Sequence, residues 1–77
     1  MELSQTDFDI LNAIKTGRVG GGTLINHFVD YCDNAIGGHP QPLIDAGLIK
    51  SDGTSVDGLT NAGLAAWQDY KDKHPVA

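Results

Sequence analysis

The side chains with the most reactive chemistry lie in the middle of the chain, where two histidines and the single cysteine alternate with acids. His27, Cys32 and His39 could offer imidazole and thiolate ligands, but the spacing His-x4-Cys-x6-His matches no common tetrahedral zinc pattern. A nucleophile pair drawn from Cys32 and His39 has no third residue in sight to orient the histidine, and no oxyanion-hole motif accompanies it. We therefore expect no catalytic residue, no metal site and no cofactor, and the chain is predicted not to be an enzyme.

A glycine-rich segment, GRVGGGT at residues 17–23, is the second candidate for chemistry. A glycine loop that leads into a helix can bind phosphate through its backbone N–H groups. The P-loop pattern, however, needs a lysine before its Ser or Thr, and here Thr23 follows Gly22 directly. We interpret the segment as a flexible connection between two helices, with Thr23 as the N-cap of the second helix.

Charge limits the kinds of partner that the chain can bind. Ten acids and five bases give a formal net charge of −5, and no Lys or Arg occurs between Val19 and Ile49. Non-specific affinity for nucleic acid depends largely on cations that release counterions from the phosphates. The cations near the helix ends, Lys15, Arg18, Lys71 and Lys73, are explained by the helix dipole alone. This distribution favours a protein partner over DNA.

Length and composition predict one domain that covers residues 1–77, because a chain of this size can form only one small core. No apolar run approaches the roughly 20 residues of a membrane-spanning helix, and the N-terminus is acidic and polar, unlike a signal peptide. The single Cys32 cannot form an internal disulfide, which fits a reducing compartment. We expect a cytoplasmic protein without a membrane partner.

Three helices are predicted in the first part of the chain. Ser4 and Asp7 have the spacing of a capping box at the start of the first helix, and Gly17 is suited to its end. The second helix carries the widest apolar stripe in the chain and ends at Gly37. The stripe includes Cys32 and Ala35, and Cys32 is expected to pack there as a small hydrophobic residue. The predicted ranges are 5–16, 23–36 and a short third helix from Pro42 or Pro40 to Ala46, since proline is tolerated in a first helical turn.

A β-hairpin and a last helix complete the predicted chain. Residues 48–50 and 55–57 alternate as short strands around a turn at residues 51–54. Thr60 is the expected N-cap of the last helix, and Pro75 is its expected stop. The predicted fold class is mainly α with a small β-hairpin.

Two motifs support a more specific interpretation. LIDAGLI at residues 43–49 and LTNAG at residues 59–63 resemble the pattern of winged helix-turn-helix proteins. The chain is most similar to small regulators of the MarR and ArsR kind and to short winged-helix proteins of prophages. This resemblance implies three helices, a β-hairpin called the wing, and a C-terminal helix.

The same resemblance implies a role for the helix before the Gly47 turn, which enters the major groove in DNA-binding members. Positions 34–45 of this chain, NAIGGHPQPLID, contain no cation, and two glycines and two prolines leave room for barely more than one turn of regular helix. The alternative hypothesis is a dimeric DNA-binding transcriptional regulator. Its contact residues would be Arg18, Asn34, His39, Gln41 and Lys50.

The hypothesis that we favour retains the winged-helix fold, but the partner is a protein rather than DNA. We expect a non-enzymatic, acidic winged-helix module that acts through protein–protein binding, as an accessory protein of a phage or other mobile element that modulates a host nucleic-acid machine. A basic surface of the other protein would meet an acidic face. The expected partner-binding residues are Asp30, Tyr31, Asp33, Asn34, His39 and Gln41.

The last helix carries bulky side chains at helical spacing beside alanines, which is typical of a buried face or a dimer contact. Leu64, Trp67 and Tyr70 are the candidates for self-association. The sequence leaves both a monomer and a homodimer open.

Overall fold

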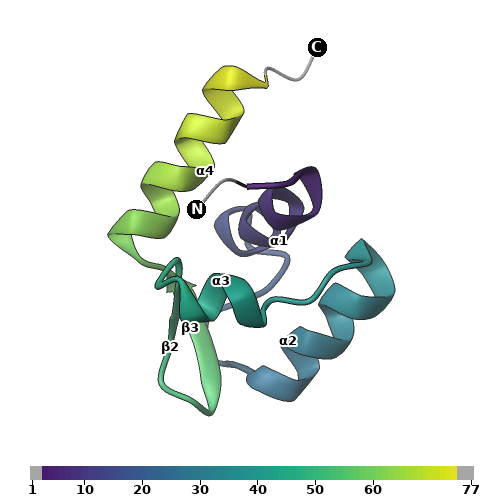
Figure 1. Ribbon diagram of the computed structural model, residues 1–77. Helices are drawn as coiled ribbons and strands as arrows, with labels where there is room; N and C mark the ends of the chain where they lie inside the picture. Colours follow the sequence, from purple (N-terminus) through teal and green to yellow (C-terminus); the bar gives the residue numbers. More distant parts are fainter. Residues whose placement is uncertain (1–2, 75–77) are drawn as a thin grey trace.

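The computed structural model describes residues 3–74, in which four α-helices pack around a three-stranded antiparallel sheet with strand order β1-β3-β2 (Figure 1). The mainly helical prediction with a small β component is confirmed, but the sheet has one strand more than the predicted hairpin. Helix α1 contacts α4, β3 and η1, so it lies at the centre of the fold. The elements in chain order are α1 (Gln5–Lys15), β1 (Thr23–Leu24), α2 (Ile25–Tyr31), the π-helix η1 (Cys32–Ile36), α3 (Gln41–Asp45), β2 (Ile49–Ser51), β3 (Ser55–Leu59) and α4 (Asn61–Lys73).

Helix α1 begins at the predicted capping box. The Ser4 hydroxyl accepts a hydrogen bond from the Asp7 N–H at 3.1 Å, and the Asp7 carboxylate accepts one from the Ser4 N–H at 3.0 Å. Two otherwise unpaired backbone donors are satisfied in this way. The helix ends at Lys15, and Gly17 follows in the left-handed conformation with φ of 85°.

The predicted start of the second helix is wrong. Thr23 and Leu24 form strand β1, paired with β3, and the helix begins only at Ile25. The Ile25 N–H donates to the carbonyl of Thr54 at 2.9 Å, so the hairpin satisfies a donor that an N-cap side chain would otherwise satisfy. The Thr23 hydroxyl donates instead to the carbonyl of Gly20. Strand pairing, which the local sequence does not reveal, therefore overrides the cap pattern.

The same helix ends as predicted at Ile36, but its last turn is the π-helix η1. The Gly37 N–H donates to the carbonyl of Cys32 at 2.7 Å, five residues back rather than four. The wider turn rotates the following side chains relative to a regular α-helix. Cys32 is fully buried, whereas Ala35, expected on the apolar stripe, is exposed.

The short third helix is confirmed to within one residue as α3, which has five residues and carries Pro42 in its first turn. Leu43 is its fully buried side chain. Gly47 follows with φ of 78°, a backbone conformation that favours glycine, and turns the chain into β2.

Strand β2 begins and ends one residue later than predicted, β3 extends two residues beyond its predicted end, and β3 pairs on its other side with β1. The register shifts between Lys50 and Ser51, which marks a β-bulge. The turn is closed by the Asp52 carboxylate, which accepts hydrogen bonds from the Thr54 and Ser55 N–H groups, each at 2.9 Å.

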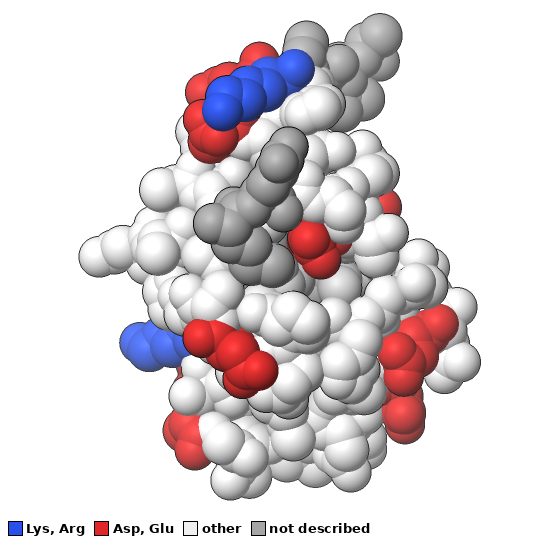
Figure 2. Space-filling model, in the orientation of Figure 1, with Lys and Arg blue, Asp and Glu red and all other residues white. Residues whose placement is uncertain are grey.

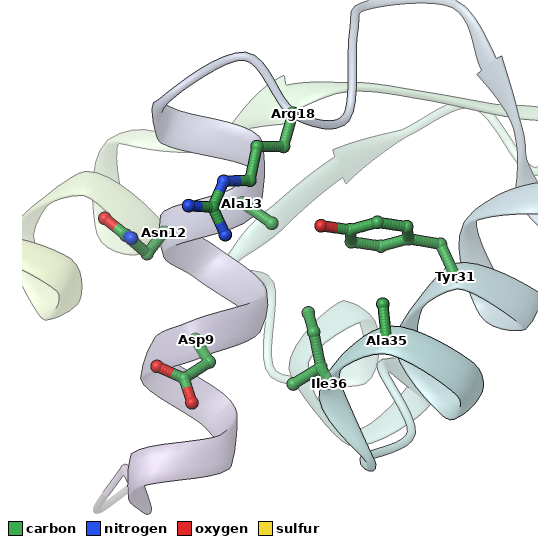
Figure 3. A pocket seen from close by; sticks show the side chains of 7 residues that line it. All are labelled: Asp9, Asn12, Ala13, Arg18, Tyr31, Ala35 and Ile36. Carbon is green, nitrogen blue, oxygen red and sulfur yellow. The ribbon is translucent and has the colours of Figure 1, made fainter.

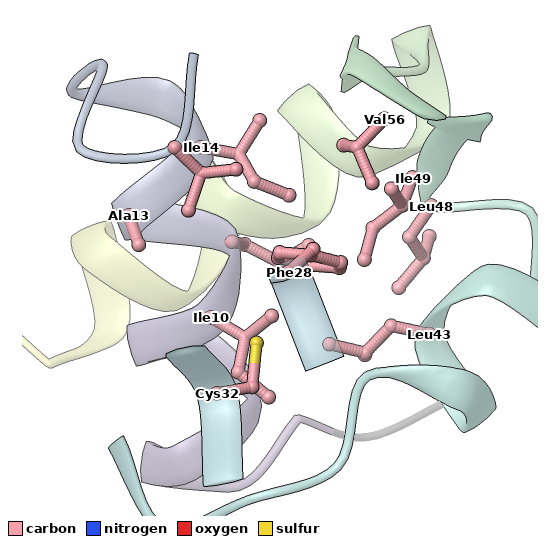
Figure 4. Packing of buried hydrophobic residues seen from close by; sticks show 11 residues of the cluster. Ile10, Ala13, Ile14, Phe28, Cys32, Leu43, Leu48, Ile49 and Val56 are labelled. Carbon is pink, nitrogen blue, oxygen red and sulfur yellow. The ribbon is translucent and has the colours of Figure 1, made fainter. Parts of the chain in front are cut away.

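The core lies where α1, α2, α3 and the sheet meet (Figure 4). Phe28 lies at its centre and is fully buried, as is Cys32, which packs among aliphatic side chains as the sequence predicts. No polar or charged residue is buried in the described range, so apolar packing dominates the core. The fully buried large side chains are Phe28, Ile10, Leu11, Leu43, Val56, Pro40 and Cys32.

Thr60, the predicted N-cap of helix α4, connects this helix to the turn that precedes the hairpin. The Thr60 hydroxyl accepts from the Gly63 N–H at 3.0 Å and donates to the carbonyl of Gly47 at 2.6 Å. The two motifs that carry the winged-helix resemblance are therefore in direct contact. The described part of α4 ends at Lys73, and the predicted stop at Pro75 lies outside the described residues.

Candidate functional site

The expected partner-binding residues, apart from Tyr31, form an exposed segment that runs from the end of α2 to α3. We call Asp30, Asp33, Asn34, His39 and Gln41 the η1–α3 face. The two elements are held near one another, since the His39 Nδ1 atom lies 3.9 Å from a carboxylate oxygen of Asp33. The Gln41 amide donates to the Asp45 carboxylate at 2.8 Å. This face offers carboxylates and amides to a partner and no cation.

Tyr31 lies apart from these exposed side chains. It is half-buried, and its ring points toward α1, where it helps to line a hollow of about 260 Å³ between α1 and η1 (Figure 3). We call this cavity the α1–η1 hollow. Its lining residues are Asp9, Asn12, Ala13, Arg18, Tyr31, Ala35 and Ile36.

Arg18 brings the only cationic side chain to the lining of the α1–η1 hollow. It follows α1 directly, and Val19, which is buried, anchors the backbone beside it through a hydrogen bond from its N–H to the Ala13 carbonyl. Within residues 3–74, no carboxylate lies within 4.0 Å of the guanidinium group. The Asp9 carboxylate, on the same hollow, accepts a hydrogen bond from the Gln5 amide instead.

Asn12 connects the α1–η1 hollow to the last helix. Its side-chain oxygen, Oδ1, accepts a hydrogen bond from the Trp67 indole N–H at 3.0 Å. Because this bond occupies the amide oxygen, the orientation of the Asn12 amide is set, and its NH₂ group is left as the available donor. Trp67 therefore couples α4 to the lining of the hollow.

The self-association candidates on α4 pack largely within the chain. Trp67 and Tyr70 are half-buried and stack on Phe8 of α1, with ring centroids 6.4 and 4.7 Å away. The Tyr70 hydroxyl also donates to the Gln5 side chain. Leu64 remains 38% exposed. Of the three candidates, Leu64 is the most exposed to solvent.

The lysines are distributed away from the η1–α3 face. Lys15 and Lys71 each place their ammonium group about 5 Å from the centre of the Trp67 ring, a cation–π distance. Lys73 pairs with Asp69 at 3.1 Å. Lys50 is exposed in β2. On the face seen in Figure 2, basic side chains are visible near the free end of α4, next to acids, and at the left edge of the molecule; separate acidic side chains are spread over a mainly neutral surface.

The residues proposed for DNA contact come from five separate elements and connections. Arg18 lines the hollow beside Tyr31, whereas Asn34 and His39 belong to the η1–α3 face. Gln41 is engaged by its neighbour Asp45, and Lys50 lies in the hairpin. No hydrogen bond or ion pair joins any two of these five described side chains.

The cysteine and histidines do not assemble a reactive centre. Burial, and to a smaller extent the Asp33 carboxylate, raises the pKa of the Cys32 thiol from 9.0 to about 11, so the thiol stays protonated near neutral pH. His27 and His39 are exposed, while Cys32 is fully buried. Among residues 3–74, no three His, Cys, Asp or Glu side chains are grouped to hold a metal ion.

Sequence reasoning missed the contributions of Asp9 and Asn12. Both lie on α1 at the polar positions of an amphipathic helix, where a solvated face is the ordinary interpretation. Their neighbours Arg18, Tyr31 and Ile36 come from later elements, and only the packing of η1 against α1 brings them together.

Comparisons with known proteins found no match: no protein-family model fits the sequence, and neither the curated proteins nor the solved structures contain a significant match. Among the described residues, no helix has the length and apolar character needed to cross a membrane.

Proposed function

We propose that the chain is a non-enzymatic winged helix-turn-helix module that works in the cytoplasm by binding another protein. The order of elements supports the fold: three helices, a hairpin that belongs to a small antiparallel sheet, and a C-terminal helix. The contact between Gly47, Thr60 and Gly63 also supports it, because it gives both motif glycines a structural role. The function is then inferred from the surface rather than from the fold.

The observation that carries the proposal is the composition of the η1–α3 face. Its side chains are exposed and include Asp30 and Asp33, and the chain has no Lys or Arg from Val19 to Ile49. Helix α3, which occupies the place of a DNA-reading helix, has only five residues. A surface without cations gains little from counterion release on DNA, but it complements a basic protein surface.

The partner that fits this face is a protein with a cationic surface, such as one that holds nucleic-acid phosphates. Occupying that surface would let a small acidic module modulate a nucleic-acid machine, the role expected of a mobile-element accessory protein.

Two charge-matched variants test the proposal. Asp30→Lys/Asp33→Lys reverses two charges on the η1–α3 face, and Asp57→Lys/Asp72→Lys makes the same change in net charge at two exposed acids elsewhere. We expect the wild-type chain and the second variant to capture the same protein from host lysate, and the first variant to lose it. Equal loss with both variants would show that only net charge matters and would contradict the proposed face.

A DNA titration at low and moderate salt tests the competing function. Binding at about micromolar affinity with a steep inverse dependence on salt would favour the dimeric DNA-binding regulator over a protein-binding module. We expect no such binding for the purified chain.

A further inference from the structure

We propose that the α1–η1 hollow binds the carboxylate group of a small organic acid. This inference concerns a different part of the surface from the η1–α3 face and does not depend on the proposed protein partner. It rests on three groups that line this hollow from different elements and can donate hydrogen bonds: the Arg18 guanidinium, the Asn12 NH₂ group and the Tyr31 hydroxyl.

The guanidinium is the principal donor. A chain with twice as many acids as bases leaves Arg18 without a carboxylate within 4.0 Å in the described range, although Asp9 lines the same hollow. Arginine presents paired N–H groups that match the two oxygens of a carboxylate. The carboxylate of a ligand could form the ion pair with Arg18 that no carboxylate of the described residues forms.

The Asn12 amide and the Tyr31 hydroxyl would orient the bound carboxylate. The Trp67 indole holds the oxygen of Asn12, so only the NH₂ group of this residue remains to donate. The Tyr31 hydroxyl projects from α2 toward Ala13 on the opposite wall (Figure 3), and it makes no hydrogen bond with another described residue. Both groups can donate to an oxygen that the guanidinium has already attracted.

The size of the hollow and the charges around it limit the kind of ligand that it can bind. The volume of about 260 Å³ is below the usual 300–1,000 Å³ of drug-sized pockets, so the hollow suits a ligand of a few carbon atoms. The exposed lining is mainly polar, so Ala13, Ala35 and Ile36 offer little apolar surface to those carbons. The Asp9 carboxylate on the rim repels a second negative charge, which favours a monocarboxylate over phosphate.

The test is a titration of the purified chain with acetate, propionate, butyrate and inorganic phosphate. The readouts are the NMR signals of the Asn12 side-chain NH₂ and the Arg18 Nε–H, together with the fluorescence of Trp67, the only tryptophan in the chain. We expect saturable shifts of these signals with the carboxylates. Phosphate should bind more weakly than butyrate.

Arg18→Gln removes the charge at an exposed position, and Lys50→Gln makes the same charge change in β2 as the matched control. We expect the first variant to weaken butyrate binding about tenfold or more, since hydrogen bonds to charged groups contribute roughly 1.5–3 kcal/mol. Tyr31→Phe should weaken binding severalfold, and Lys50→Gln should leave it unchanged. Equal weakening by Arg18→Gln and Lys50→Gln would overturn the proposal.

Two further results would also overturn the proposed carboxylate site. One is tighter binding of phosphate than of butyrate. The other is the absence of a saturable shift at about 10 mM butyrate, where a Kd near 1 mM would give almost full occupancy.

The carboxylate could come from a free acid or from a glutamate side chain of a protein. Glutamate blocked as its N-acetyl amide separates these sources, because its only carboxylate is on the side chain. Tighter binding of butyrate supports the site as a receptor for free acids, and tighter binding of the blocked glutamate supports the carboxylate site with a protein side chain as its occupant.

Discussion

Gly63 of α4 lies against the carbonyl group of Leu48, so closely that a Cβ atom at position 63 would overlap the carbonyl oxygen. The backbone of the last helix therefore packs directly on the backbone that leads into β2. The Thr60 N–H donates to the same Leu48 carbonyl at 3.1 Å, which holds the helix start in this place. The glycine of the LTNAG motif is thus explained by close approach rather than by an unusual backbone angle.

Gly63→Ala should destabilise the protein by about 1–3 kcal/mol, even though alanine favours helix, because α4 must shift away from Leu48. Gly21→Ala is the matched control: a Cβ there meets no atom within 4 Å, and Gly21 has no positive φ. Urea unfolding monitored by circular dichroism measures both. Similar midpoints for the two variants would contradict the close approach.

The bond between Trp67 and Asn12 should appear as a coupling energy. A double-mutant cycle of Asn12→Ala and Trp67→Phe retains an aromatic ring on Phe8 and removes the 3.0 Å hydrogen bond. We expect a coupling of about 0.5–1.5 kcal/mol from urea unfolding followed by circular dichroism. A parallel cycle of Asn12→Ala with Lys50→Ala should be additive, and a coupling of the same size there would refute the assignment.

Cys32 should be unreactive in the folded protein. Its thiol is fully buried, and its pKa is raised to about 11, so little thiolate exists at pH 8. We expect Ellman's reagent to label the native chain only as fast as it unfolds, and the urea-unfolded chain at once. Rapid stoichiometric labelling of the native chain would mean that the site opens to solvent.

The same pKa shift predicts a pH dependence. Because the folded thiol holds its proton up to about pH 11 and the unfolded thiol releases it near 9.0, the native state binds more protons in this window. Stability should therefore fall as the pH rises from about 9 to about 11. A Cys32→Ala variant, measured by urea unfolding across this range, should lose that part of the dependence.

Asp52 should make the stability of the folded protein fall at acid pH rather than at alkaline pH. Hydrogen bonds from the Ser55 and Thr54 N–H groups to its carboxylate lower its pKa below the ordinary value. Folding therefore favours the charged form, and the contribution of Asp52 is present above its unfolded pKa and lost as pH falls through its folded pKa. NMR titration should place the Asp52 midpoint below the ordinary pKa of an aspartate, and Asp52→Asn should reduce the acid sensitivity of the hairpin. An Asp52 midpoint at the ordinary value would show that these hydrogen bonds are not maintained in solution.

The local sequence determined the features whose causes are local. The Ser4 and Thr60 caps, the apolar faces of α1 and α2, and the proline in the first turn of α3 each depend on residues within one helical turn. The burial of Cys32 among apolar neighbours follows from the same periodicity. These predictions were correct because neighbouring side chains set them.

Contacts between distant segments decided the rest. Strand β1 exists only because β3 pairs with Thr23 and Leu24, and this pairing displaced the predicted start of the second helix. Ala35 and Ile36 of η1 line the hollow together with residues of α1, and Arg18 and Tyr31 complete it. The sequence by itself therefore determined the helices, the hairpin and the cation-free η1–α3 face. Only tertiary packing, which joins residues far apart in the chain, decided the third strand, the inward position of Trp67 and the donors that line the α1–η1 hollow.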